Sequence, residues 1–340
     1  MNNNNQHTTT SSTNADRSKV ILVTGGLGYL GSQLIRDLAT AEVALIIRIL
    51  DNMQGKHYPA LMGLPTNVHY QFVEGDILDP AATRMALTGV ETVIHLAAIV
   101  RTPMSFEQPQ WVEQVNHWGT SHLLEACLEM SVSRFIYTSS TAVYGPGGPF
   151  AEAAPCRPQG AYAQSKRRAE VAVQTAQQRG LQTTILRLGT LFGLAPVTRF
   201  EAVANRFAYY AGVGRPLTVY GSGQQRRALV HVRDASQAVL FCLTHPADTI
   251  GQLFNATAVN ASVLELVTTI QALKPNVEVH YTEQDIRTHS SFEANSTALR
   301  SLGWQPRHSL ETGLGKLLNQ FRGFTSIHKS GLAFEEYAGL

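Results

Sequence analysis

The chain of 340 residues is poor in cysteine and has no long apolar run. Its three cysteines, Cys127, Cys156 and Cys242, are widely scattered, which argues against a disulfide framework and against a zinc site. No stretch reaches the ~18 consecutive apolar residues that a membrane span needs. Residues 1–18 are almost entirely polar and lack the apolar core of a signal peptide. We therefore expect a disordered polar tail at residues 1–18, reduced thiols, a cytoplasmic location and no membrane partner.

The chain also has no marked excess of positive or negative charge. The 27 basic side chains nearly balance the 25 acidic ones, and no basic stripe indicates a nucleic-acid partner. The 12 histidines show no metal-ligand spacing, so we expect no metal. An apolar fraction of 44% and a charged fraction of 15% are typical of a globular protein.

A glycine-rich stretch near the N-terminus is the most informative part of the sequence. An apolar, β-branched run at residues 20–24 stops at a cluster of glycines, and a helical apolar pattern follows it. Gly25 suits a tight turn, Gly28 lets phosphates approach the backbone, and Gly31 lets the helix pack closely. The start of the helix, at Tyr29 and Leu30, offers free N–H groups to a pyrophosphate.

An acidic residue follows at the spacing that a dinucleotide site requires. A second apolar run at residues 44–50 ends at Asp51, twenty positions after Gly31. A carboxylate there accepts hydrogen bonds from an adenosine ribose and repels a 2′-phosphate, which favours NAD over NADP. Glycines also gather in ordinary turns, but strand, glycines, helix, strand and acid stand here in register. The sequence therefore predicts an NAD site.

Short apolar runs alternate with helical patterns from residue 19 to about residue 188. Runs at 68–73, 92–96, 134–138 and 183–188 read as strands, and residues 111–130 and 160–178 read as helices. This alternation predicts an α/β fold with a doubly wound parallel sheet of the Rossmann type. Ligands then bind beyond the carboxyl ends of the strands. The loops expected there contain Asp51, Asn52, Asp76, Ile77, Leu96, Ala97 and Ala98.

Asp76 and His95, two polar residues near these strand ends, each have an alternative interpretation. Asp76 could accept a hydrogen bond from an adenine amine, or it could cap the helix that follows. His95 is expected to be a packed strand residue rather than a ligand.

The alternation breaks after Gly193. Helical patterns at residues 199–212, 234–243, 262–273 and 310–321 surround short strands at 229–232 and 252–255, and the latter could rejoin the main sheet. We assign residues 19–188 and about 229–258 to the NAD-binding domain. Residues 189–228 and 259–335 are assigned to a smaller, interleaved C-terminal α/β lobe that binds substrate.

A tyrosine and a lysine in the predicted helix at 160–178 form the candidate catalytic pair. Tyr162 and Lys166 are four residues apart and so lie on one helix face. A nearby ammonium favours the phenolate of a tyrosine, whose ordinary pKa is about 10. Ser140 follows a strand at the edge where a ligand should lie, and its hydroxyl can hold the reacting oxygen against Tyr162. The arrangement predicts hydride transfer between a carbinol and NAD, with Tyr162 as acid and base.

The sequence resembles the extended short-chain dehydrogenase/reductases, in the branch of nucleotide-sugar epimerases and dehydratases. The resemblance runs from residue 20 to about residue 315 and rests on residues 24–31, 50–52, 75–76, 95–98, 139–145, 162–166, 220–227 and 231–234, together with Asn116, Gly119 and Thr120. It implies that Ser140, Tyr162 and Lys166 are catalytic, that Asn116 lies in the cofactor site, and that Thr141 contacts substrate. It also implies that Arg227 grips the substrate diphosphate, for which a guanidinium is suited.

Departures from the family pattern narrow the reaction. Where 4,6-dehydratases carry Asp-Glu after the catalytic Ser/Thr, this chain has Thr141 and Ala142. The resemblance is therefore nearest to the 4-epimerases, which act through a transient 4-keto sugar. Thr190 stands where the family often has Asn, and Ala228 where it often has Asp, so the substrate lobe is not standard. Thr190 could bind phosphate through its hydroxyl.

Two other functions stay open at this level. The first is a net NAD-dependent dehydrogenase or ketoreductase of a sugar nucleotide or another small alcohol. The second is a dinucleotide-sensing regulator, against which the retained Tyr162 and Lys166 count. The resemblance also implies a homodimer through the helices at residues 111–130 and 160–178, although an internal core would explain their apolar side chains equally well.

Overall fold

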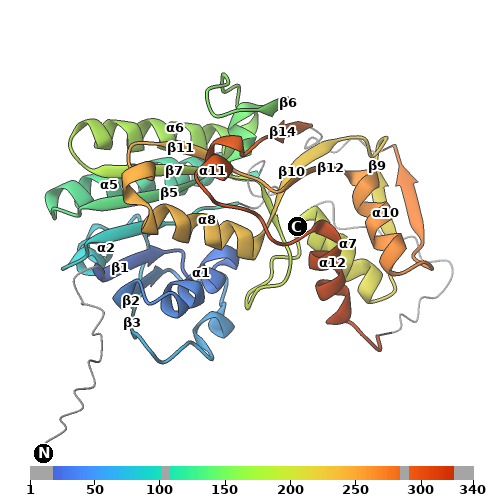
Figure 1. Ribbon diagram of the computed structural model, residues 1–340, viewed down its shortest axis with the longest axis horizontal. Coiled ribbons are helices and arrows are strands. Elements are labelled where there is room, and N and C mark those ends of the chain that lie inside the picture. The colour runs from blue at the N-terminus through green and yellow to red at the C-terminus, as the bar shows by residue number, and fades with distance from the viewer. Residues whose placement is uncertain (1–17, 101–106, 284–290, 325–340) are drawn as a thin grey trace, which may run out of the picture.

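The computed structural model describes residues 18–100, 107–283 and 291–324 (Figure 1). Its main sheet has seven strands, all parallel. In spatial order the strands are β11 (Leu253–Ala256), β7 (Gln182–Leu188), β5 (Arg134–Ser140), β4 (Thr92–His95), β1 (Ser18–Thr24), β2 (Ala44–Asp51) and β3 (His69–Glu74). The expected doubly wound parallel sheet is confirmed, and the short run near residue 253 does rejoin it as an edge strand.

Helices cover both faces of this sheet, so its central strands are buried on both sides. The helices α1 (Tyr29–Thr40) and α8 (Val232–Thr244) lie on one face, and α2 (Pro80–Leu87), α5 (Thr120–Glu129) and α6 (Gly160–Gln178) on the other. In β1, Ile21 and Val23 join the first core while Leu22 joins the second. Successive strand residues point to opposite faces, which is why the four consecutive residues from Val20 to Val23 are all apolar.

The helix expected at residues 111–130 is not one regular helix. It consists of α4 (Pro109–Glu113), a π-helical segment η3 (Gln114–Gly119) and α5. A π segment has i→i+5 hydrogen bonds in place of i→i+4 bonds, so it shifts the helical phase and changes which side chains point inward. Asn116 is 1% exposed, whereas Trp118 is 56% exposed. Apolar spacing alone does not reveal such a segment.

A second, smaller group of elements forms the lobe (Figure 1). Its sheet contains β12 (Val259–Ser262), β10 (Arg226–His231), β14 (Phe292–Ala294) and β6 (Gly147–Phe150), with β8 (Thr190–Phe192) paired to β10. A two-stranded sheet of β13 (Val279–Thr282) and β9 (Leu217–Tyr220) lies beside it, and α7 (Val203–Gly212), α10 (Val263–Leu273) and α12 (Leu310–Asn319) enclose a separate core. The shorter elements are η2 (Tyr58–Leu61), η4 (Thr141–Tyr144), α9 (Pro246–Thr249) and α11 (Thr297–Ser301).

Two details of the lobe differ from the sequence-based expectation. The helix expected from residue 199 begins at Val203, because residues 193–202 instead run as a loop along the main domain. Strand β6 lies within the range assigned to the NAD-binding domain, yet it pairs with β14 of the lobe sheet. Within the described residues, no helix is long and apolar enough to cross a membrane.

Candidate functional site

The glycine loop after β1 has the shape of a phosphate cradle. Gly25 has φ +67°, and a Cβ there would lie 2.6 Å from the backbone nitrogen of Ala97. At Gly31 a Cβ would lie 2.5 Å from the carbonyl oxygen of Gly25, so the helix rests directly on the loop. Helix α1 begins after Gly28 with no side-chain cap and no acid in its first turn. Its first N–H groups and positive dipole end are thus left for an anion, and this geometry fits a dinucleotide pyrophosphate.

Three polar side chains extend this cradle past β2 and β3. Asp51 accepts hydrogen bonds from the backbone nitrogens of Leu27 (3.1 Å) and Met53 (3.0 Å), which places its carboxylate beside the glycine loop. Burial raises the pKa of Asp51. The Asn52 amide donates to Asp76 Oδ2 at 2.8 Å. Asp76 does not cap the next helix, because Asp79 is the N-cap of α2. The cap interpretation of Asp76 is therefore wrong.

The loop after β4, which carries Leu96, Ala97 and Ala98, is held from two sides. The Asn116 amide accepts from Ile99 N (2.7 Å) and donates to Ile99 O (2.9 Å). Its Nδ2 also donates to Ser165 Oγ at 3.2 Å, so Asn116 ties the loop to α6. On the other side, the packed histidine His95 shares hydrogen bonds with Thr24 (2.6 Å) and Thr120 (2.9 Å). His95 is 1% exposed, as expected for a core residue.

Tyr162 stands in the first turn of α6, facing the end of β5. Burial raises the pKa of Tyr162, while a hydrogen bond with Ser140 and the positive charge of Arg199 act in the opposite direction. Ser140 is the N-cap of η4, where its Oγ accepts from Ala142 N at 3.2 Å. The structure thus brings together the hydroxyl and the phenol that the sequence singled out.

Lys166 lies one turn further along α6 and points toward the same strand. Its Nζ donates to the carbonyl oxygen of Thr138 at 2.8 Å and lies 4.9 Å from the ring centre of Tyr137. Burial lowers the pKa of Lys166 to about 7, and the charge of Glu170 opposes this shift. Lys166 is therefore buried and held against β5, one turn along α6 from Tyr162.

The predicted substrate ligands are more dispersed. Thr141 is 1% exposed, and its hydroxyl donates to Leu188 O (3.3 Å). Thr190 lies in β8 opposite Leu229 of β10. Arg227 lies in β10, with its guanidinium carbon 5.2 Å from the ring centre of Phe292. Burial lowers the pKa of Arg227.

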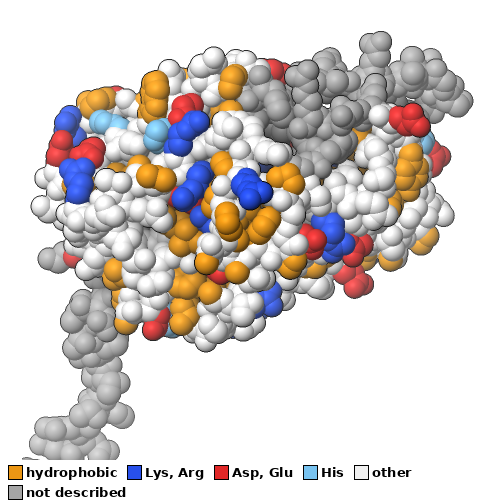
Figure 2. All heavy atoms as spheres, turned by 90° about the horizontal axis from the view of Figure 1, so that it is seen from above, with side chains coloured by type: hydrophobic (Ala, Val, Ile, Leu, Met, Phe, Trp, Pro, Cys, Tyr) orange, Lys and Arg blue, Asp and Glu red, His pale blue; other side chains and the backbone are white. Residues whose placement is uncertain are grey.

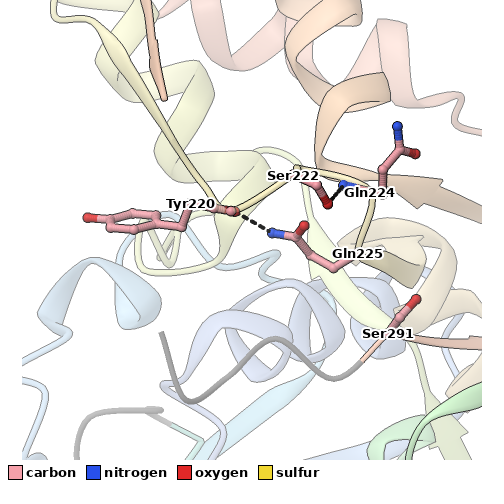
Figure 3. Close-up of a pocket in the computed structure, with 6 residues that line it drawn as sticks. Tyr220, Ser222, Gln224, Gln225 and Ser291 are labelled. Carbon is pink, nitrogen blue, oxygen red and sulfur yellow. Dashed lines mark hydrogen bonds between the residues drawn. The ribbon is translucent and has the colours of Figure 1, made fainter. Parts of the chain in front are cut away.

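A pocket lies in the lobe at the turn that leads into β10, the strand that contains Arg227 (Figure 3). It is lined by Tyr220, Gly221, Ser222, Gln224, Gln225 and Ser291. The Gln225 amide donates to the Tyr220 carbonyl oxygen at 3.3 Å, and the Arg226 backbone nitrogen donates to Ser291 Oγ at 2.9 Å. These contacts fix the turn at Gly221 and leave amide and hydroxyl groups around the pocket.

Two buried interactions near the site were not predicted from the sequence. The Tyr29 hydroxyl donates to Gly193 O and accepts from Asn205 (3.0 Å), which ties the start of α1 to the loop entering the lobe. Glu170 and Arg187 form an ion pair at 2.7 Å behind Ser139. Glu170 could have been identified from its spacing. It lies four residues after Lys166 and eight after Tyr162, so it continues the same helix face.

Comparisons with known proteins agree with this geometry. A family model described as the NAD dependent epimerase/dehydratase family matches residues 21–256. A dTDP-D-glucose 4,6-dehydratase from Mus musculus is 30% identical over 90% of this chain and 89% of its own length. An uncharacterized UDP-glucose epimerase from Bacillus subtilis is 29% identical, over 86% of this chain and 95% of its own. The structure of UDP-glucose 4-epimerase from Thermus thermophilus with NAD superimposes with a TM-score of 0.78 at 25% identity, covering 89% and 99%.

Proposed function

The chain belongs to the NAD-dependent epimerase/dehydratase family, and on this premise we propose that it epimerises the sugar of a nucleotide-diphosphate sugar at C4. NAD is its cofactor. Relatives of this chain are named for UDP-glucose and dTDP-glucose, and these two nucleotide sugars are the substrates to test first.

The residues around the glycine loop fit the cofactor. Gly25, Gly28 and the uncapped start of α1 would hold the pyrophosphate, and Asp51 would hold the adenosine ribose. When bound, NAD takes up a hydride from a sugar carbon and can return it. Tyr162 would accept the proton of the sugar hydroxyl, and Ser140 would hold the same oxygen by a hydrogen bond.

The two residues after Ser140 favour epimerisation over 4,6-dehydration. Elimination of water needs an acid and a base beside the sugar, in addition to the tyrosine. Here the two positions are Thr141, whose hydroxyl is occupied by Leu188 O, and Ala142, which has no polar side chain. Neither can exchange a proton as a carboxylate does. One tyrosine is enough for epimerisation, because it removes the proton in one direction and returns it in the other.

The rival reaction is 4,6-dehydration, which the mouse relative at 30% identity favours. We would incubate the purified protein and NAD with UDP-glucose and with dTDP-glucose in D2O, and follow the sugars by proton NMR. Epimerisation gives the C4 epimer with no deuterium on carbon, because the hydride returns from the cofactor. Dehydration gives a 6-deoxy-4-keto sugar that contains solvent deuterium. Accumulating NADH would instead establish the net dehydrogenase, and each of these last two results would refute the epimerase.

The lobe supports a nucleotide as part of the substrate. The pocket at the turn before β10 presents amide and hydroxyl groups, and Arg227 of β10 presents a planar fork that can pair with a diphosphate. Thr190 adds a hydroxyl on the neighbouring strand β8. We propose that these groups hold the nucleoside diphosphate while its sugar reaches Tyr162.

We also propose a homodimer through η3, α5 and α6. These helices pack against each other on one face of the main sheet, and η3 and α6 each present an apolar side chain to solvent. Trp118 of η3 is 56% exposed and Val171 of α6 is 49% exposed. Figure 2 views the molecule from the side of α6 and shows apolar side chains between pairs of opposite charge. Such a surface suits a second copy of the same helices.

A further inference from the structure

Helix α6 is fastened to the end of β5 at three successive turns. The three contacts pair Tyr162 with Ser140, Lys166 Nζ with Thr138 O (2.8 Å), and Glu170 Oε1 with Ser139 Oγ (2.6 Å). The first of these is the predicted catalytic pair. The third is shorter than the second, and it joins two residues outside that pair.

Glu170 is itself anchored on a third element. Its carboxylate accepts from Arg187 Nε at 2.8 Å and from Arg187 Nη2 at 2.7 Å, which is a bidentate ion pair. Glu170 is 0% exposed and Arg187 is 2% exposed. Arg187 of β7 is the direct neighbour of Ser139 in the parallel pairing of β5 with β7. Glu170 therefore fixes α6 against two adjacent strands at the point where the chain leads into Ser140.

The first turn of α6 has no side-chain cap, and the helix is held by contacts along its length, such as the bond from Asn116 Nδ2 to Ser165 Oγ at 3.2 Å. The helix begins at Gly160, only two residues before Tyr162, and its N-cap residue Gln159 makes no side-chain capping hydrogen bond. First turns without a cap tend to fray. The position of the Tyr162 hydroxyl therefore depends on contacts further along the helix.

We propose that Glu170 is a positioning residue for proton transfer at Tyr162: through Ser139 and Arg187 it holds the strand end and the helix face in the register that joins Ser140 to Tyr162. This inference rests on the proposed role of Tyr162 as acid and base. It concerns Ser139 and Glu170, which act through Ser140 and Tyr162.

The decisive variant is Ser139→Ala, because it breaks the link and leaves the Glu170–Arg187 ion pair intact. Glu170→Asp is the second variant, since it keeps the charge but draws the carboxylate back from Ser139. Arg167→Gln is the matched control. Arg167 also contacts Glu170 (2.9 Å), but from the outer side, where its side chain is 34% exposed.

One readout needs no substrate. Carbon-13 NMR of ζ-labelled tyrosine in the NAD-bound protein reports the titration of Tyr162, which is assigned by the signal lost in Tyr162→Phe. A weakened hydrogen bond from Ser140 favours the phenolate less. We therefore expect the midpoint to rise by about one pH unit in Ser139→Ala and in Glu170→Asp. Ser140→Ala should show the full rise, and Arg167→Gln should match the wild type.

The second readout is turnover of the nucleotide sugar. We expect Ser139→Ala to lower kcat about tenfold with KM within about twofold, because the loss acts on the transition state and not on binding. Unchanged Tyr162 midpoints in both variants, alongside a clear rise in Ser140→Ala, would overturn the proposal. If no nucleotide sugar reacts at all, the proposed function fails, and the tyrosine titration still decides the role of Glu170.

Discussion

At the scale of single residues, Tyr162 needs help to act as a base. Burial raises its pKa, and the lysine expected to lower it donates instead to the carbonyl oxygen of Thr138. The groups that counter the burial are Ser140, by a hydrogen bond, and Arg199, by its charge. Arg199 belongs to the loop before α7, and its Nη2 donates to Val100 O at 2.9 Å. The electrostatic setting of Tyr162 thus comes partly from outside the Tyr/Lys pair.

Tyr162→Phe should lower kcat by about 10²–10⁴-fold, the usual contribution of a positioned acid or base. The ring remains, so thermal stability and bound NAD should match the wild type. Turnover is followed by NMR, and NAD by mass spectrometry of the denatured protein. Wild-type turnover in this variant would remove Tyr162 from the mechanism. Tyr281→Phe is a suitable control, because Tyr281 is 63% exposed on β13.

Asp51→Asn should weaken NAD binding about tenfold and reduce the preference for NAD over NADP, because a carboxylate pairs more strongly with ribose hydroxyls and repels a phosphate. The Asn side chain can still accept from Leu27 N, so the loop should keep its shape. Calorimetric titration with each cofactor measures both effects. Asp79→Asn, which alters the cap of α2, should leave both affinities unchanged. A wild-type protein that prefers NADP would contradict our assignment of Asp51.

At the scale of elements, the contact between α1 and the glycine loop has no spare room. A Cβ at Gly31 would lie 2.5 Å from Gly25 O and 2.6 Å from the Gly26 Cα, and both are backbone atoms that cannot rotate away. Helix α12 contains a glycine in a different setting. A Cβ at Gly315 would meet only the side chain of Leu273, at 3.7 Å.

These two glycines give a matched pair of variants. Gly31→Ala should destabilise the protein by about 2 kcal/mol or more and reduce NAD binding, because the loop must move. Gly315→Ala should stabilise it by about 0.5–1 kcal/mol, since alanine favours a helix over glycine. Urea unfolding of both variants measures the difference. Equal effects of the two substitutions would show that the close contact at Gly31 is not important.

The regular elements could be predicted because their signals are local. The apolar run at residues 20–24 and the pattern at 160–178 each follow from residues close in the chain, and α6 has the predicted bounds. The π segment η3 has no such local signal, since Asn116 is turned inward by its bonds to Ile99 in another loop. Thr141 was assigned to substrate by resemblance, but the partner that occupies its hydroxyl, Leu188, is 47 residues away. Contacts of this kind depend on the folded sheet.

At the scale of the whole molecule, two buried histidines make stability depend on pH. Burial lowers the pKa of His95 to about 3 and that of His231 to about 4, whereas an unfolded histidine titrates near 6.5. The unfolded chain therefore binds more protons between these values. The stability from the neutral imidazoles is complete above about pH 6.5 and is lost as the pH falls toward about 4.

We expect the free energy of unfolding to fall by several kcal/mol between about pH 7.5 and about pH 5, because each histidine contributes up to about 1.4 kcal/mol per pH unit. In His231→Asn this fall should be smaller by about 2 kcal/mol, since one titrating group is gone. His280→Gln is the control, because the His280 side chain is 61% exposed. Urea unfolding at the two pH values tests this, and an equal fall in His231→Asn and wild type would contradict it.

The dimer proposal is tested at the same scale. Trp118→Lys places a charge on the exposed part of η3 and should convert a dimer to a monomer in analytical ultracentrifugation. Tyr281→Lys changes an equally exposed aromatic residue on β13 and should leave the mass unchanged. A wild-type protein that sediments as a monomer would refute the proposed dimer.

Strand β6 has a consequence for how such proteins can be recombined. It leaves the main domain between Ser140 and Tyr162, pairs with β14 of the lobe sheet, and returns before α6 begins. The lobe is therefore not a cassette that can be cut out at the two ends of a single insertion. A chimera that receives another protein's lobe must also receive a matching strand from between Ser140 and Tyr162, or the graft leaves one edge of its sheet unpaired.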